Sequence, residues 1–219
     1  MKHDFWHERW LRSEIGFHQQ EFNTHLQEFW PDLGLSSDAG VFVPLCGKSL
    51  DLLWLRAQGH EVTGVEISPV AVRDFFREND LTPRMSRQGP FERWETDGLA
   101  ILCGDFFDLG TADLQNYSGI FDRASLIALP PEMRKDYAVR LRRITPPGAR
   151  TLLVAMEYLQ EQMQGPPFSV REEEIRQLYG ETYDIKRLYS LDILGEHARF
   201  REKGLTGLTE KVYLMEPGV

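Results

Sequence analysis

GVFVPLCGKS, residues 40–49, is the stretch that decides the fold of this chain, and GHEVTGVEIS, residues 59–68, completes it. A β-branched and aromatic run leads into a tight turn at Gly47, and apolar residues then recur at helical spacing until Gly59 ends the helix. The second run stops at Glu66, about 20 residues beyond the turn. This order of strand, turn, helix, strand and acid is typical of a fold that binds a nucleotide-like ligand. In such folds a helix N-terminus holds one end of the ligand and a carboxylate binds its ribose hydroxyls.

The turn itself departs from two well-known phosphate-binding motifs. A phosphate-binding loop that ends in the GKS run at 47–49 needs a glycine where this chain has Phe42. The dinucleotide fingerprint also fails, because Gly47 is the only glycine of residues 41–49 and a pyrophosphate needs close backbone approach at several glycines. NAD, FAD and ATP are therefore disfavoured, whereas S-adenosylmethionine (AdoMet), which has a ribose and no phosphate, fits. An ordinary α/β turn with an incidental acid is the alternative.

Composition and charge limit the class of protein. The 219 residues can bury a substantial core, and 42% hydrophobic with 27% charged residues is normal for a soluble globular protein. A net charge of −9 disfavours broad contact with RNA or DNA. We find neither an apolar run of about 18 residues nor a signal segment, so a cytoplasmic protein without a membrane anchor is expected. Cys46 and Cys103 are expected to be buried thiols, and no metal site is expected.

Alternating elements along the chain predict an α/β fold. Residues 4–30 are rich in aromatic side chains and are expected to be helical and to cover another part of the protein. Beyond residue 66 we expect a helix from Ser68, a hairpin within 82–98, strands at 99–103, 120–123 and 151–157, helices at 131–145 and 170–178, and a final pair of strands at 183–194 and 208–215. Two consecutive strands after an alternating series indicate a mostly parallel sheet with an antiparallel edge.

Four candidate binding residues follow predicted strands. Leu45, Glu66, Asp105 and Arg123 come at or just after the ends of the first four core strands. Because ligands of such sheets bind beyond the carboxyl ends of the strands, these positions are expected to share one site.

Seven segments, spread over nearly the whole chain, resemble one protein family. They are WHERW at 6–10, FHQ at 17–19, VPLCGKSLD at 43–51, GVEIS at 64–68, FDR at 121–123, GPPF at 165–168 and EKVYL at 210–214. They are similar to the thiopurine S-methyltransferases in their bacterial form. The PLCGKS turn makes this match specific, because AdoMet enzymes more often carry several glycines there.

The resemblance implies a class I AdoMet-dependent methyltransferase formed as one domain over residues 1–219. It implies a Rossmann-like, mostly parallel seven-stranded sheet with one antiparallel strand near the edge, and residues 1–30 as an N-terminal helical lid segment. The implied reaction is methylation of the thiol of small heteroaromatic, thiopurine-like substrates. Bacterial members are also associated with selenium and tellurium compounds, so a small-molecule thiol or selenium acceptor is expected.

The resemblance also implies two sets of site residues. The residues expected to bind AdoMet are Trp10, Leu45, Glu66, Asp105, Phe106 and Arg123. Those expected to bind the substrate are Phe17, Arg123, Pro166, Pro167, Phe168 and Arg199. Glu66 suits the ribose hydroxyls, Asp105 and Phe106 suit adenine, and the π face of Trp10 suits the cationic sulfonium. Arg123 suits either the carboxylate of AdoMet or an acidic group on the substrate.

Alternatives to these roles remain. Trp6 and Trp10 could be packing aromatics, Arg123 could form an ion pair with Asp122 or Glu157, and Arg199 could lie on a solvated charged face.

Methyl transfer from a sulfonium is an in-line displacement that needs alignment and exclusion of water. A heteroaromatic thiol is largely ionised near neutral pH, so we expect no general base. The competing functions are a kinase that uses the GKS run, a non-catalytic AdoMet sensor and a nucleic-acid methyltransferase. No heptad pattern demands a partner, so a monomer is expected.

Overall fold

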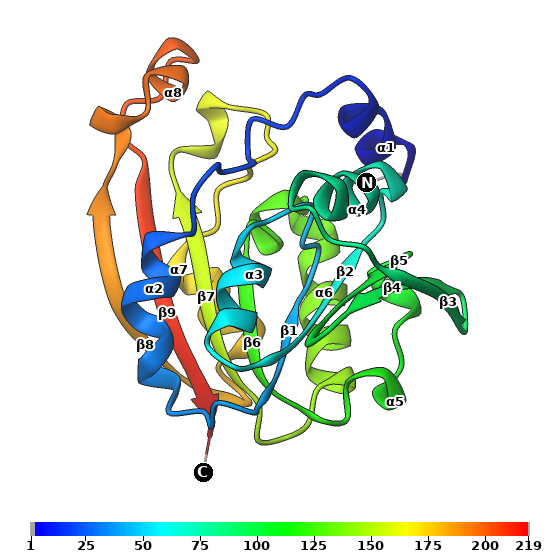
Figure 1. Ribbon diagram of the computed structural model, residues 1–219. Coiled ribbons are helices and arrows are strands. Elements are labelled where there is room, and N and C mark those ends of the chain that lie inside the picture. The colour runs from blue at the N-terminus through cyan, green and yellow to red at the C-terminus, as the bar shows by residue number, and fades with distance from the viewer. Residues whose placement is uncertain (1–2, 219) are drawn as a thin grey trace.

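The computed structural model describes residues 3–218 and shows one twisted sheet with helices on both faces (Figure 1). The strands are β1 Gly40–Val43, β2 Glu61–Glu66, β3 Arg84–Gln88, β4 Phe91–Thr96, β5 Leu99–Cys103, β6 Tyr117–Arg123, β7 Arg150–Glu157, β8 Tyr183–Asp192 and β9 Thr209–Pro217. The α-helices are α1 His3–Leu11, α2 Thr24–Phe29, α3 Asp51–Ala57, α4 Pro69–Glu78, α5 Thr111–Leu114, α6 Pro131–Ile144, α7 Glu172–Tyr179 and α8 Ala198–Glu202. Among the short 3-10 turns are η2 Phe106–Asp108 and η3 Leu126–Ala128.

The sheet has nine strands in the order β3-β4-β5-β2-β1-β6-β7-β9-β8. Strands β5, β2, β1, β6 and β7 run parallel to one another, and β9 is antiparallel to both β7 and β8, so the expected antiparallel strand near the edge is confirmed. The expectation of seven strands is wrong, because the predicted hairpin, β3–β4, joins the β5 edge of the sheet and adds two strands. Its tight turn uses Gly89 at φ +56°, a conformation that glycine adopts without strain.

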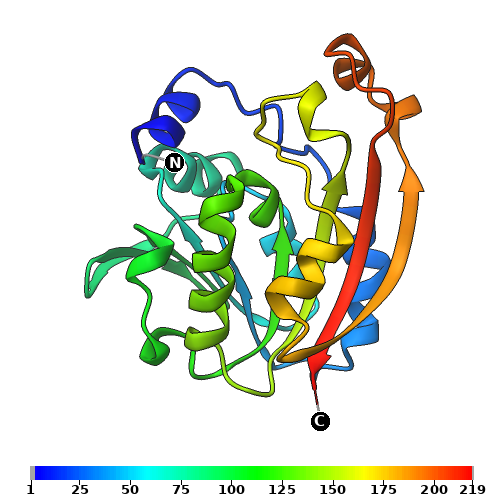
Figure 2. The same cartoon turned by 180° about the vertical axis from the view of Figure 1, so that it is seen from behind.

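Helices cover both faces of the sheet because their apolar sides pack against it. In α6, Tyr137, Ala138, Leu141 and Ile144 are buried at helical spacing on the face seen in Figure 2. On the opposite face α2, α3 and α4 pack against the strands (Figure 1). No helix within residues 3–218 is long and apolar enough to cross a lipid bilayer.

The N-terminal segment is not the continuous helix that the aromatic pattern predicted over residues 4–30. It consists of α1, an irregular stretch from 12 to 23, and α2. Ser13 has φ 56°, a left-handed conformation that ends α1, and the Asn23 side chain caps α2 by accepting a hydrogen bond from the Leu26 N–H. Helix α1 consequently lies beside α4, over the carboxyl end of the parallel strands (Figure 1).

Candidate functional site

A cavity lies at the carboxyl end of the parallel strands, under α1 and the irregular stretch that follows it. Its walls come from the ends of β1, β2 and β6, from η3, from the loop at 165–168 and from α8. This is the edge at which the strand ends were expected to meet, so the parallel topology brings Leu45, Glu66 and Arg123 together.

The turn after β1 forms one wall of the cavity. Leu45 has φ 44° and Gly47 has φ 55°, so the backbone folds back on itself between the strand and α3. Trp10, only 5% exposed, lies directly over this turn, and a Cβ added at Gly47 would stand 3.1 Å from its indole. The absence of a side chain at Gly47 therefore lets the aromatic ring close over the turn.

Glu66 is held in one orientation at the end of β2. Its Oε2 accepts from the Gly47 N–H at 2.9 Å, and its Oε1 accepts from the Ser68 N–H at 2.7 Å. Burial raises the pKa of this carboxyl to about 7, although the backbone donors act in the opposite direction. Each oxygen keeps a second lone pair, so the carboxylate can still accept two further hydrogen bonds, such as those of a pair of ribose hydroxyls.

Two arginines hold consecutive carbonyls of the irregular N-terminal stretch. The Arg123 Nη2 donates to the Phe17 carbonyl oxygen at 3.5 Å, and the exposed Arg199 donates to the Gly16 carbonyl oxygen. Burial lowers the pKa of Arg123, while the charges of Asp51 and Glu210 act in the opposite direction. Arg123 forms no ion pair with Asp122 or Glu157 in the described chain, and Arg199, though exposed, borders the cavity.

Aromatic and proline side chains line the rest of the cavity. The Phe17 ring meets Trp6 and Trp10 edge to face, with centroids 5.8 and 5.6 Å away. Pro166 and Pro167 also line the cavity. These flat apolar surfaces form a slot of the kind that a small aromatic ligand fills.

Three predicted site residues do not border the cavity. Phe168 packs under the backbone of Gly165, where an added Cβ would stand 2.5 Å from its ring. Phe106 is only 4% exposed and packs against Tyr137 with ring centroids 4.8 Å apart. Asp105 accepts from the Phe107 N–H at 2.9 Å and caps η2. The adenine contact of Asp105 and Phe106 and the substrate contact of Phe168 stay predictions.

Asp51, the last residue of the VPLCGKSLD segment, is only 2% exposed and lies at the cavity wall. Its Oδ1 accepts from the Asn23 N–H at 2.8 Å, and its Oδ2 accepts from the Ser49 hydroxyl at 2.9 Å. Asp51 thus ties the turn before α3 to the start of α2. Its place two residues after the PLCGKS turn was a signal for this role that the sequence reasoning did not use.

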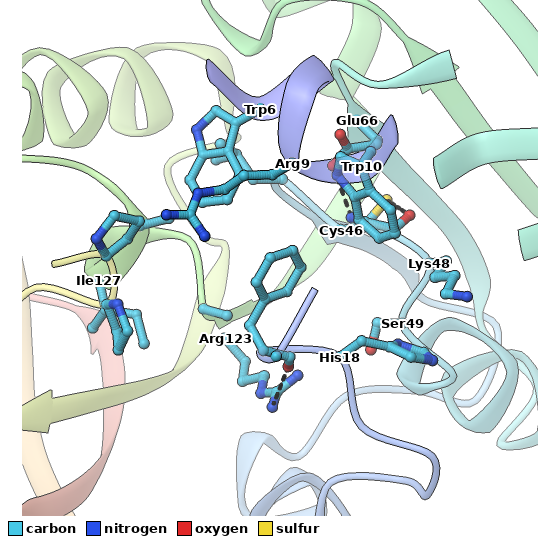
Figure 3. A pocket seen from close by; sticks show the side chains of 18 of the residues that line it. Trp6, Arg9, Trp10, His18, Cys46, Lys48, Ser49, Glu66, Arg123 and Ile127 are labelled. Carbon is cyan, nitrogen blue, oxygen red and sulfur yellow. Dashed lines mark hydrogen bonds between the residues drawn. The ribbon is translucent and has the colours of Figure 1, made fainter. Parts of the chain in front are cut away.

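Further cavity residues were also missed by sequence reasoning: Arg9, Glu14, His18, Lys48 and Lys203. Figure 3 shows Arg9 beside Trp6, on the opposite side of the cavity from Lys48 and Ser49. Lys48 is bound by both carboxylate oxygens of Glu78, at 2.9 and 2.7 Å. A lysine engaged in this way does not form the phosphate cradle that a kinase would need.

No group of three His, Cys, Asp or Glu side chains in residues 3–218 is arranged to hold a metal ion. Cys46 and Cys103 are free thiols, and burial raises the pKa of both, so neither is a ready thiolate.

The sequence has extensive similarity to known proteins. The family model described as Thiopurine S-methyltransferase matches residues 1–218. Thiopurine S-methyltransferase from Azotobacter vinelandii is 50% identical over 216 residues, which cover 99% of this chain and 99% of that protein. The thiopurine S-methyltransferase of Nitrosospira multiformis is 47% identical over 215 residues, with 98% of both chains covered.

Solved structures show the same architecture. A SAM-dependent methyltransferase from Anabaena variabilis matches with a TM-score of 0.65 at 12% identity, covering 99% of this chain and 95% of that one. The Burkholderia thailandensis 1,6-didemethyltoxoflavin-N1-methyltransferase, solved with S-adenosylhomocysteine, matches with a TM-score of 0.63 at 14% identity, covering 98% and 87%. At these identities the likeness shows the fold.

Proposed function

Since this chain belongs to the thiopurine S-methyltransferase family and is an AdoMet-dependent S-methyltransferase, we propose that its cavity holds AdoMet and a small thiol acceptor side by side. The observation that carries the proposal is Glu66, a buried carboxylate that two backbone N–H groups orient at the end of β2, next to a turn without a side chain at Gly47. This arrangement fits the ribose of a nucleoside cofactor.

The cofactor half of the cavity lies around Glu66, Leu45 and Trp10. We assign to Glu66 the two ribose hydroxyls, because each of its oxygens has a spare lone pair. The left-handed backbone at Leu45 opens the turn toward the ligand. Trp10, packed over Gly47, places a π face where a cationic sulfonium would be stabilised.

The acceptor half of the cavity lies between Phe17, Pro166 and Pro167, with Arg123 and Arg199 at its border. The flat apolar walls suit a heteroaromatic ring, and the two guanidinium groups favour an anion. When bound, AdoMet supplies a methyl group on a positively charged sulfur. The residues of the chain orient the acceptor thiolate in line with that methyl and keep water out, and no side chain is assigned as a general base.

The resemblance implies a lid over residues 1–30, and in this proposal we limit it to residues 3–23, because Leu26 and Trp30 are buried in the core beside the sheet. Arg123 and Arg199 hold the lid through the carbonyls of Phe17 and Gly16, and the ring of Phe17 stands between Trp6 and Trp10. An anionic acceptor competes with these carbonyls for the same two arginines. Acceptor entry is therefore coupled to movement of the lid.

Transfer of labelled methyl from AdoMet to 6-mercaptopurine by the purified protein tests this function. Turnover that saturates in both components would support the reaction and the acceptor class. A folded protein that binds S-adenosylhomocysteine and transfers no methyl to 6-mercaptopurine would refute thiopurine-type specificity. Selenite and small thiols would then be assayed, because methylation of selenium and tellurium compounds is part of the proposal.

Four further features complete the proposal. We place the chain in the cytoplasm as a monomer that forms one domain over 1–219 and does not act on nucleic acid. The net charge of −9 supports the absence of nucleic-acid substrates, and the single sheet to which all strands of residues 3–218 belong supports one domain. Analytical ultracentrifugation of the purified protein tests the monomer.

A further inference from the structure

The cavity is bordered by a cationic side chain, Arg9 on helix α1, to which the proposed function assigns no role. Figure 3 shows its guanidinium extending into the cavity beside Trp6, with Ile127 across from it. Glu66 and Cys46 lie elsewhere on the wall, near Trp10. Arg9 therefore faces the part of the cavity that we assign to the acceptor.

The guanidinium of Arg9 lacks strong partners. Its Nε is buried and has no hydrogen-bond partner within residues 3–218. Within residues 3–218 its carboxylate neighbour is Glu14, at 3.9 Å from Nη1 and with a side chain that is 51% exposed, so this ion pair is weak. The Phe5 ring stacks against the guanidinium at 4.7 Å and holds its plane in place. Because Arg9 borders the cavity, a guanidinium whose Nε has no acceptor in the described chain is available to bind a ligand there.

A second cation, Lys203, borders the same cavity from the far side. It follows α8 and has no carboxylate partner in the described part of the chain. Arg199, one turn earlier, is already engaged by the Gly16 carbonyl. Cationic side chains therefore border the acceptor half of the cavity on the α1 side and on the α8 side, in a protein whose net charge is −9.

The walls between these cations are apolar, and they include Trp6, Ile127, Pro166 and Phe200. A neutral ring would fill the slot but would leave the guanidinium of Arg9 partly desolvated and only weakly paired, with Glu14. An aromatic acceptor that carries a carboxylate or another anionic substituent would satisfy it, since a guanidinium can bind such a group with two parallel N–H donors.

We infer that Arg9 is a specificity-determining residue that binds an anionic substituent of the acceptor, separate from the sulfur that receives the methyl group. The inference rests on the proposed function, because it names the acceptor class of that site. The Glu14 carboxylate pairs with the Arg9 guanidinium when no acceptor is bound, and the anionic substituent of the acceptor takes the place of Glu14. Binding of the anion also draws α1 onto the acceptor.

The test compares acceptors that differ in one carboxylate. The value of kcat/KM is measured for benzenethiol and for 2-, 3- and 4-mercaptobenzoate with the full-length protein and with Arg9→Gln. For the best mercaptobenzoate, we expect Arg9→Gln to lower kcat/KM relative to benzenethiol by about 10-fold or more, the scale of a lost charged hydrogen bond. The ratio between acceptors cancels differences in the fraction of folded protein, and comparing that ratio between the two proteins cancels differences in thiol ionisation.

Two further variants have defined expected effects on this ratio. Glu14→Gln removes the competing carboxylate and is expected to raise the preference for the mercaptobenzoate about twofold to fivefold. Arg73→Gln, an exposed arginine of α4 outside the cavity, is the matched control and leaves the ratio unchanged. The inference is wrong if Arg9→Gln leaves all three kcat/KM ratios, each mercaptobenzoate against benzenethiol, within about twofold of those of the starting protein. It is also wrong if Arg9→Gln instead weakens the binding of S-adenosylhomocysteine by about 10-fold.

A binding measurement separates this inference from the proposed function. Calorimetric titration of the S-adenosylhomocysteine complex with 2-, 3- and 4-(methylthio)benzoate and with thioanisole reports the same preference without turnover. If no acceptor is methylated but an Arg9-dependent preference for a methylthiobenzoate persists, the proposed reaction fails and the anion site stands. If methylation proceeds and neither ratio depends on Arg9, the reaction stands and the anion site fails.

Discussion

Replacing Glu66 by alanine is the sharpest test of the cofactor site. In the proposed complex the carboxylate accepts hydrogen bonds from the ribose, and such bonds to a charged group contribute about 1.5–3 kcal/mol. The expected loss of affinity for S-adenosylhomocysteine is therefore about 12- to 160-fold, since a tenfold change corresponds to about 1.4 kcal/mol.

The same substitution affects stability by a separate route. The N–H groups of Gly47 and Ser68 lose their acceptors, and an unsatisfied buried donor costs about 1–3 kcal/mol. Water that enters from the adjacent cavity can accept hydrogen bonds from these N–H groups and offsets part of this cost. We therefore expect the free energy of unfolding to fall by about 1–3 kcal/mol in total. For a chain of this size that lowers Tm by about 2–12 °C. Glu66→Gln keeps an acceptor and is expected to retain most of the stability while losing the charge.

The raised pKa of Glu66, about 7, adds a pH signature. Ribose hydroxyls donate to the ionised carboxylate, so binding favours the ionised form, lowers its pKa and releases a proton. The affinity for S-adenosylhomocysteine is therefore expected to rise between pH 6 and 8, by about tenfold at most, and to be flat in Glu66→Gln over that range.

Isothermal titration calorimetry at pH 6, 7 and 8, with a thermal melt of each variant, measures all of these effects. A Glu66→Ala protein that melts cooperatively and binds S-adenosylhomocysteine as tightly as the starting protein would remove Glu66 from the site. A pH dependence that survives in Glu66→Gln would assign the titration to another group.

Three other predictions concern the lid and the scaffold. S-adenosylhomocysteine is expected to slow hydrogen exchange in residues 3–20, and equal protection with and without the ligand, measured by mass spectrometry, would contradict a mobile lid. His60 accepts a hydrogen bond from the Trp30 indole N–H at 2.9 Å, and burial lowers the pKa of His60 from 6.5. The unfolded chain therefore binds the proton better, and the free energy of unfolding is expected to fall as pH drops below about 6.5. The urea midpoints at pH 7.5 and 5.5 should differ less in His60→Gln, and an unchanged difference would exclude His60 as the cause of this pH dependence. Arg134, only 1% exposed, binds both carboxylate oxygens of Glu174 at 2.7 Å, and Glu174 is itself partly exposed. Arg134→Ala is therefore expected to cost about 1.5–3 kcal/mol of unfolding free energy, the scale of a lost hydrogen bond to a charged group. A loss below about 1 kcal/mol in chemical denaturation would show that the pair does not stabilise the fold.

Local signals were sufficient to predict most of the fold. The hairpin followed from the turn-rich composition of residues 82–98, and the antiparallel strand near the edge followed from two consecutive strands at the end of the chain. The strand count was wrong because the sequence of a hairpin does not say whether it stays free or adds to a sheet edge. The N-terminal helix was predicted too long because aromatic content gives no information on the left-handed conformation at Ser13.

Side-chain direction was the part of the site that local reasoning could not supply. Phe168 adjoins Pro166 and Pro167 in sequence, yet it turns under Gly165 and packs inward. Arg9 and Asp51 are charged residues at the end and the start of helices, where sequence reasoning expects solvent exposure. Their access to the cavity depends on helix packing and not on their neighbours in the sequence.

The sequence by itself determined the parallel core, the order of its elements and the edge at which Leu45, Glu66 and Arg123 meet, because strand ends of a parallel sheet must share one edge. The tertiary structure decided which side chains face the cavity and what holds them. Arg199 reaches the carbonyl of Gly16 across 183 positions of sequence, and such contacts exist only after distant segments have packed. The physical reason is that hydrogen bonding within a segment is set by nearby residues, whereas the lining of a cavity is set by the packing of the whole chain.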